Sequence, residues 1–114
     1  MNKKERLENE KTCRRLLDRD NRFGSHVGCF RWHDSNSDAH ELKKLEVFLE
    51  RKRLGHSVMT EAVFEGGGRC DVLDLSSGLV IEILASETEE EAREKVGLYP
   101  ASLEVMFVEV DKDE

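Results

Sequence analysis

Two acidic residues stand in apolar runs of the segment from Gly66 to Leu84, GGGRCDVLDLSSGLVIEIL. Asp71 and Glu82 occupy positions where the apolar pattern predicts core residues. Buried carboxylates that converge repel each other unless a proton or a cation neutralises one of them. Carboxylate oxygens favour hard divalent ions, so this pattern predicts a Mg²⁺ or Mn²⁺ site.

The elements that must position these acids form a β-hairpin. The residues Ser76-Ser77-Gly78 separate the two apolar runs, and a three-residue connection suits antiparallel strands. Because side chains alternate along a strand, Asp71 shares a face with Leu73, and Glu82 shares a face with Val80. If the hairpin turns these two faces to the same side, the carboxylates meet.

The rest of the chain reads as an α/β scaffold around this hairpin. We expect a polar helix over residues 2–20, a loop over 21–37, a helix over 38–54, a strand over 56–64, a helix capped by Ser86 that stops at Gly97, and a strand over 103–110. From Asp38 onward the order is therefore helix, three strands, helix, strand. The expected buried stripe of the 38–54 helix comprises Leu42, Leu45, Phe48 and Leu49.

Glu41 lies on the edge of that stripe and has two interpretations. In the first, its carboxylate points toward the surface against which the helix packs and has a functional role. Alternatively, Asp38 and Glu41 have the spacing of a capping box, in which the glutamate returns a hydrogen bond to the helix start. The pattern does not separate the two interpretations.

Length and composition indicate one domain of 114 residues with no apolar run long enough to cross a bilayer. The N-terminal residues lack a signal-like apolar segment, so we expect a cytoplasmic protein without membrane contact. The three cysteines cannot all pair within the chain, which argues against a disulfide framework.

The net charge of −7 is unevenly distributed along the chain. Residues 1–56 hold 14 Lys or Arg against 10 Asp or Glu, a balance of +4, and residues 57–114 hold 4 against 15, a balance of −11. A polyanion would therefore bind the first half of the chain. Alternatively, the cations of that half only form a solvated helix face. The candidate phosphate contacts there are Lys43, Lys44, Arg51, Lys52 and Arg53.

Four possible zinc ligands occur in the first third of the chain: Cys13, His26, Cys29 and His33. Their spacing is not that of a zinc finger, because no CxxC pair is present and twelve residues separate the first two. Incidental loop histidines and half-buried thiols are the favoured interpretation, and structural zinc is the alternative.

The order of elements, with an acid on the helix from Asp38, an Asp on the second strand and a Glu on the third, resembles the core of the PD-(D/E)xK phosphodiesterase superfamily. That superfamily includes restriction endonucleases, Holliday-junction resolvases and RecB-type nuclease domains. The resemblance covers residues 38–110. It implies an αβββαβ restriction endonuclease-like core, a mixed sheet flanked by helices, over residues 38–114, with residues 1–37 as an N-terminal helix and loop extension.

Several residues match positions of this superfamily. Asp71, after a glycine-rich approach, resembles its metal-binding Asp, and Glu82 resembles the acid of its (D/E)xK element. Glu41 is similar to the helix-one glutamate of resolvase-like branches. Lys95 and Tyr99 resemble the helical motif of RecB-like members, so Tyr99 joins the candidates for nucleic-acid contact.

The resemblance implies metal-assisted hydrolysis of phosphodiester bonds in nucleic acid, with DNA the favoured substrate. Asp71, Glu82 and the main-chain carbonyl of Ile83 would hold one Mg²⁺ or Mn²⁺. Glu41 would complete that site or help to bind a second ion. Small nucleases of this kind often work as homodimers.

One departure from the family pattern stands two residues after Glu82, where Leu84 replaces the expected lysine. A leucine cannot stabilise the negative charge of a transition state. Lys95 is the candidate replacement and Arg69, a further candidate for nucleic-acid contact, is the second. Lys95 can instead be a cation that the helix dipole favours near a helix C-terminus.

Two other functions remain open at this point. A catalytically inactive relative could bind nucleic acid or a protein partner, and the leucine together with the negative net charge favours it. In a plain α/β domain, Asp71 and Glu82 would instead pair with Arg69 or with lysines in a structural network.

Overall fold

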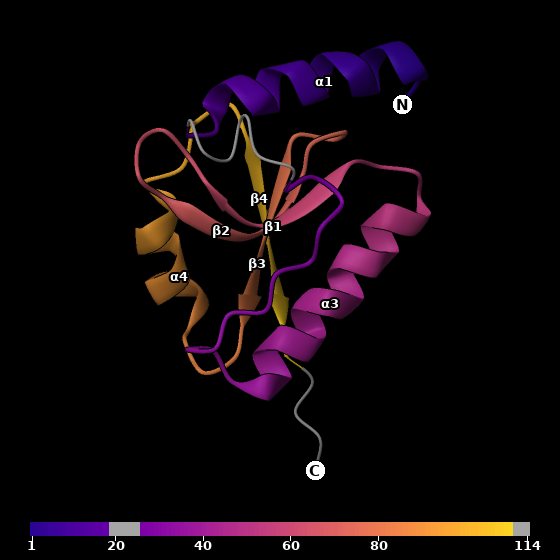
Figure 1. Ribbon diagram of the computed structural model, residues 1–114. Helices are drawn as coiled ribbons and strands as arrows, with labels where there is room; N and C mark the ends of the chain where they lie inside the picture. Colours follow the sequence, from indigo (N-terminus) through magenta and orange to yellow (C-terminus); the bar gives the residue numbers. More distant parts are fainter. Residues whose placement is uncertain (19–25, 111–114) are drawn as a thin grey trace.

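The order of the elements in the computed structural model follows the predicted pattern (Figure 1). The structure describes residues 1–18 and 26–110. Within these residues no helix has the length and apolar content needed to span a membrane. The helices are α1 (Lys3–Leu16), α3 (Asp38–Arg53) and α4 (Glu89–Val96), and the strands are β1 (Val58–Val63), β2 (Arg69–Asp74), β3 (Leu79–Leu84) and β4 (Glu104–Glu109).

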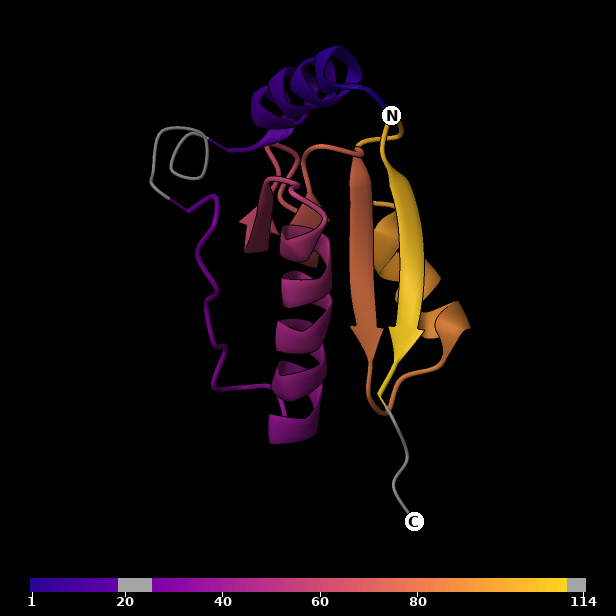
Figure 2. The same ribbon diagram turned by 90° about the vertical axis from the view of Figure 1, so that its right-hand side faces the viewer.

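The four strands form one mixed sheet in the order β1-β2-β3-β4. β1, β2 and β3 are antiparallel neighbours, and β4 runs parallel to β3 because the connection through α4 crosses back over the sheet (Figure 2). Gly78 ends the β2–β3 connection with a φ of 67°, a left-handed conformation that glycine adopts without strain. The predicted hairpin and the α/β class are confirmed.

The two faces of the sheet carry separate apolar clusters. Helix α3 lies against one face, where its Val47 and Phe48 pack with residues such as Val72 and Ile81. The opposite face carries Leu73 and Val80 together with Met59, Phe64 and Leu75. Strict alternation along the strands would place Asp71 and Glu82 together on the second face. Cys70 and Leu73 both pack in the second cluster although they are three residues apart, so the alternation breaks at Asp71, whose carboxylate faces His40 of α3.

The N-terminal segment contributes directly to the core. Cys13 of α1 and Leu17, which follows it, are buried in the same cluster as Leu73. Leu17 also forms an isolated β-bridge with Phe64. Residues 1–18 therefore pack as part of the domain, with α1 closing one end of the sheet (Figure 1).

Several predicted boundaries and caps differ from the observed ones. α1 ends at Leu16, whereas the sequence predicts its end at residue 20. Residue 20 and residues 21–25 of the predicted loop lie outside the described residues. The N-cap of α3 is Ser37, whose side chain accepts the His40 N–H at 3.1 Å. The N-cap of α4 is Thr88 in place of the predicted Ser86. Strands β1 and β4 are each shorter than the predicted runs by one or more residues at both ends.

The buried stripe of α3 also differs from the prediction. Leu42 is 58% exposed, and Leu45 and Leu49 are only partly buried. The side chains that α3 buries are His40, Glu41, Lys44, Val47 and Phe48. Apolar spacing was misleading here because ion pairs and hydrogen bonds compensate the buried polar side chains, which lets them face the sheet.

Candidate functional site

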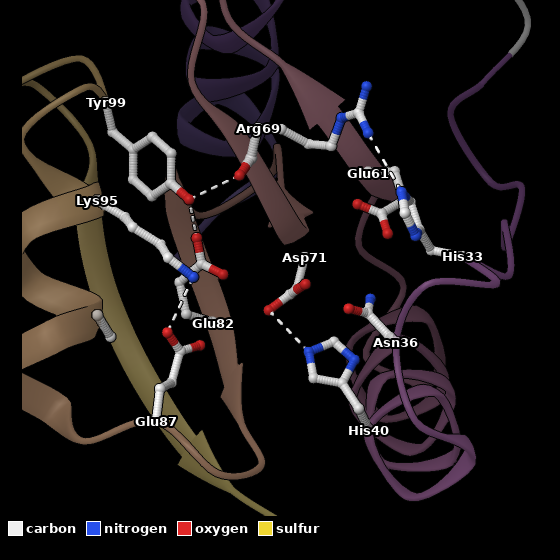
Figure 3. A pocket seen from close by; sticks show the side chains of 11 residues that line it. His33, Asn36, His40, Glu61, Arg69, Asp71, Glu82, Glu87, Lys95 and Tyr99 are labelled. Carbon is white, nitrogen blue, oxygen red and sulfur yellow. Dashed lines mark hydrogen bonds and ion pairs between the residues drawn. The ribbon is translucent and has the colours of Figure 1, made fainter.

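A pocket of about 170 Å³ opens where the N-terminus of α3, strands β2 and β3 and helix α4 meet (Figure 3). Most of its lining side chains are polar. They are His33, Asn36, His40, Glu61, Arg69, Asp71, Glu82, Glu87, Ala92, Lys95 and Tyr99. The pocket thus collects Asp71, Glu82, Lys95, Arg69 and Tyr99 from the predicted set.

The sheet is interrupted on both sides of Asp71. On one side the β1–β2 register passes from Thr60↔Val72 to Ala62↔Cys70 and omits the Glu61–Asp71 pair. Glu61 has a φ of 53°, a strained left-handed conformation for a residue with a side chain. On the other side the β2–β3 register ends at Val72↔Ile81. These two gaps leave room for a polar pocket inside the sheet.

Asp71 occupies the gap between β2 and β3. Its Oδ2 accepts the Ile83 N–H at 2.8 Å and lies 3.5 Å from Nε2 of His40. Burial alone would raise the pKa of Asp71, but the hydrogen bonds from His40, Glu82 and the Ile83 N–H together hold it below its usual value. Asp71 therefore stays ionised at neutral pH.

Glu82 faces Asp71 across the pocket and has the opposite electrostatics (Figure 3). Burial, followed by the neighbouring Asp71, raises the pKa of Glu82 to about 9. The hydroxyl of Tyr99 donates to Glu82 and also lies 2.7 Å from the Arg69 carbonyl oxygen. At neutral pH the two carboxyl groups thus share one proton and carry one negative charge.

His40 bridges the pocket and the interior of the domain. Its Nδ1 lies 2.9 Å from Glu41 Oε2, while its Nε2 faces Asp71. Burial lowers the pKa of His40, but the carboxylates of Asp71 and Glu41 outweigh burial and raise it. Sequence reasoning missed this residue. The available signal was a histidine, a common metal ligand, next to Glu41 in the first turn of the helix.

Glu41 lies behind His40 and does not line the pocket. The helix is capped by Ser37, and the fully buried Glu41 accepts hydrogen bonds from His33 and Lys44, so the capping-box interpretation is wrong. Oε1 accepts the His33 N–H and the Lys44 ammonium, the latter at 2.6 Å, and Oε2 faces His40 and Asn36. Burial raises the pKa of Glu41, but these partners, Lys44 foremost, lower it overall. This geometry fits a residue that positions His40 better than a direct metal ligand.

Lys44 is fully buried and cannot contact a phosphate, contrary to the prediction. Its ammonium donates to Glu41, to Glu61 at 3.1 Å and to the Arg31 carbonyl at 2.9 Å. Three acceptors compensate one buried cation. Lys44 therefore ties α3 to the strained residue of β1 and to the loop before α3.

The cations of the pocket come from α4 and β2. Lys95 pairs with Glu87 at 2.9 Å, a contact that raises the pKa of Lys95, and its side chain is 68% exposed. Arg69 is exposed, and its Nη1 lies 3.4 Å from His33 Nε2 (Figure 3). Both side chains line the pocket, so both cations lie close to any ligand bound there.

The other predicted phosphate contacts lie outside the pocket lining. Arg51 binds Asp74 at 2.7 Å at the opposite end of β2, which gives it a structural role. Lys43 lies beside Glu46, and the Lys52 ammonium lies 5.7 Å from the centroid of the Phe48 ring. Arg53 lies beside the partly exposed leucines of α3.

The four possible zinc ligands do not form one cluster: His26 and His33 line one pocket, whereas Cys13 and Cys29 lie outside its lining. Cys13 is buried, with its thiol 3.7 Å from the Leu75 carbonyl, and burial raises its pKa to about 11. Cys29 is exposed, and His33 lines the pocket. Within the described ranges, no three His, Cys, Asp or Glu side chains are assembled as a preformed metal centre.

No protein-family model, no curated protein and no solved structure matches the chain. The chemistry of the site therefore rests on its own geometry. Two converging carboxyl groups, a histidine and two exposed cations line a pocket whose chemistry suits a divalent ion and an anionic group bound beside it.

Proposed function

We propose that this protein is a metal-dependent phosphodiesterase that hydrolyses nucleic acid, with DNA as the first substrate to test. One observation carries the proposal. Asp71 and Glu82 converge in a pocket, and the pKa of Glu82 is raised to about 9 by burial and by Asp71. A divalent cation would replace the shared proton and neutralise both carboxylates.

The donor set fits a hard cation. Asp71 and Glu82 supply two carboxylates, and His40 could supply an imidazole nitrogen after it loses its proton. The N–H of Ile83 points to Asp71, and the N–H and C=O of one strand residue point to the same side, so the Ile83 carbonyl is also directed there. When bound, the ion would lower the pKa of a water molecule and polarise the phosphate.

The remaining residues of the pocket have roles that follow from their charges. Lys95, held by Glu87, supplies the positive charge that Leu84 does not, and Arg69 is the second source. Leu84 is 4% exposed and packs in the interior, so its side chain is not available to a substrate. Glu41 holds His40 in orientation.

The competing proposal is an inactive relative that binds nucleic acid or a protein partner. It is favoured by Leu84 and by the ion pair that engages Lys95. The third interpretation, a structural network with Arg69 or lysines, has less support. Among the described residues, Asp71 and Glu82 interact with each other, and their further hydrogen-bond partners are His40, the Ile83 N–H and Tyr99.

Cleavage of labelled single-stranded, duplex and four-way-junction DNA, and of single-stranded RNA, tests the proposal. Each substrate is incubated with Mg²⁺, Mn²⁺ or EDTA. Metal-dependent cutting is expected, with losses in Asp71→Asn and Glu82→Gln but not in the matched control Glu104→Gln, which removes an exposed acid of β4. Absence of cutting on every substrate, with folded protein, would contradict catalysis and favour the inactive relative.

Lys95→Ala and Arg69→Ala then identify the cation that replaces the family lysine. If Lys95 acts on the transition state, its loss lowers kcat by about 100-fold or more with little change in KM. Equal activity in Lys95→Ala and wild type would contradict a catalytic role of Lys95. It would leave Lys95 with a structural role, as the ion-pair partner of Glu87 and a cation favoured by the helix dipole.

A further inference from the structure

A second pocket of about 440 Å³ adjoins the first one. Three residues, His33, Glu61 and Arg69, line both pockets, so the two form one continuous depression. The other lining residues of the second pocket are Asp18, His26, Arg31, Trp32 and Val63. The proposed hydrolytic function does not use this larger space.

Trp32 is the only tryptophan of the chain, and it is 46% exposed at this pocket. The loop that carries it is anchored along β1. The Gly28 N–H donates to the Val58 carbonyl at 2.7 Å, and the Arg31 N–H donates to Thr60 Oγ1 at 2.8 Å. The Arg31 guanidinium also donates to the carbonyls of Thr60 and Glu61. A large exposed aromatic ring is thus presented from a fixed backbone.

The charges around the indole favour an anion. Of the two acids in the lining, Asp18 and Glu61, the second pairs at 3.1 Å with the buried Lys44, a cation that it shares with Glu41. The arginines Arg31 and Arg69 contribute two positive charges, and Arg69 lies on the border between the pockets with its guanidinium toward His33 (Figure 3). A polyanion that extends from the first pocket into the second would therefore contact the Arg69 guanidinium and then the flat apolar ring of Trp32.

We propose that the second pocket binds a single-stranded polynucleotide, with one base stacked on Trp32 and a backbone phosphate on Arg69. This inference rests on the proposed function, because it places the strand that continues from the first pocket. A base can stack on a side chain only after it leaves its neighbours in a helix. The substrate class is therefore a single strand or an unpaired end, in preference to an intact duplex.

The fluorescence of Trp32 reports the contact directly, since no other tryptophan contributes. A 12-nucleotide single-stranded DNA, the RNA of the same sequence and the blunt DNA duplex are titrated in EDTA, which separates binding from cleavage. Saturable quenching by either single strand, and none by the duplex at the same concentration, is expected. Equal quenching by the duplex, or no quenching by either single strand, would overturn the inference.

Variants test the stacking residue by anisotropy of a labelled single strand. Trp32→Ala should weaken binding about tenfold, Trp32→Phe should restore most of the affinity, and the control Leu54→Ala, an exposed residue at the end of α3, should have no effect. Arg69→Gln should weaken binding and reduce its salt dependence. Unchanged affinity in Trp32→Ala would overturn the inference.

These outcomes are separate from those of the cleavage assay. Quenching without metal-dependent cutting would support the strand site and contradict the nuclease. Cutting of single-stranded DNA by Trp32→Ala with unchanged KM would support the nuclease and overturn the strand site.

Discussion

Strand β2 carries two aspartates, Asp74 buried and Asp71 partly buried, and they have opposite surroundings. Asp74 is fully buried and accepts Arg51 Nε at 2.7 Å, faces His56 Nδ1 at 2.7 Å and accepts the Ser77 N–H at 3.2 Å. Asp71, three residues earlier, faces a histidine at 3.5 Å and a second carboxyl group across an open pocket.

The backbone pairing around the two aspartates differs as well. Asp74 lies in a regular ladder, paired with Val58 on one side and Leu79 on the other. Asp71 lies where both ladders are interrupted. Charge compensation and an intact sheet mark a structural acid, whereas two carboxyl groups that share one proton in a disrupted sheet mark a site available to a ligand.

The largest expected effect is the difference in stability between the Asp74→Asn and Asp71→Asn variants. Asp74→Asn should lower the free energy of unfolding by about 3 kcal/mol, because it leaves Arg51 and His56 without their carboxylate. Asp71→Asn should destabilise the protein much less, because the Asp71 carboxylate is partly exposed and the loss of its contact with His40 is offset by an easier ionisation of Glu82. Urea unfolding at pH 7 measures both.

Metal-dependent cleavage should respond in the reverse order, provided the assay temperature keeps Asp74→Asn folded. Asp71→Asn should lose at least about 100-fold in rate, and folded Asp74→Asn should stay within a few fold of wild type. Equal destabilisation by the two substitutions would remove the distinction between the sites.

The pH dependence of stability gives the next largest effect. The pKa of Glu82 rises to about 9 on folding from an ordinary value of 4.5, so the folded state binds the extra proton. Its contribution to stability is full below about pH 4.5 and is lost as the pH rises toward 9. Glu82→Gln should therefore gain stability relative to wild type between pH 5 and pH 9.

Asp74 has the opposite sign, because its partners lower its pKa on folding. Its contribution is present above about pH 3.8 and is lost as the pH falls through its lowered value. Thermal unfolding of wild type, Glu82→Gln and Asp74→Asn from pH 3 to pH 9.5 compares the two signs. Parallel profiles for wild type and Glu82→Gln would contradict a raised pKa of Glu82.

A smaller effect follows from the close approach of Gly68 to Tyr99. A Cβ at Gly68 would lie 2.8 Å from Cδ1 of Tyr99, so Gly68→Ala should displace the ring and destabilise the protein by about 1–3 kcal/mol. Gly66→Ala is the matched control, because a Cβ there meets only the Leu98 carbonyl oxygen at 3.7 Å. Equal stability of the two variants in urea would show that the ring moves freely.

The smallest effect is expected for Tyr99→Phe. It removes the hydroxyl that contacts Glu82 and the Arg69 carbonyl, at a cost of about 1 kcal/mol. The hydrogen bond from Tyr99 lowers the pKa of Glu82, so the variant should titrate Glu82 at a higher pH. A carboxyl titration followed by NMR measures the shift, and a lower value would contradict this role of the hydroxyl.

Much of the scaffold could be predicted from local patterns. The short Ser76–Gly78 connection predicts the hairpin, which is observed, and Asp71 and Glu82 line one pocket as predicted. The expected common face is wrong, because the alternation breaks at Asp71, which faces His40 of α3. The apolar spacing of α3 misplaced its buried face, because hydrophobic periodicity cannot show that Glu41 and Lys44 compensate each other. The function inferred from the resemblance stays a prediction.

The sequence by itself determined the order of helices and strands and the hairpin that carries the two acids, since these depend on neighbours a few residues apart. Only the tertiary structure decided which cation meets which carboxylate. Arg51 reaches Asp74 and His40 reaches Asp71 across separations of more than twenty residues, through the packing of α3 on the sheet. The energy of a buried charge depends on such distant partners, so local sequence cannot distinguish a compensated aspartate from one available to a ligand.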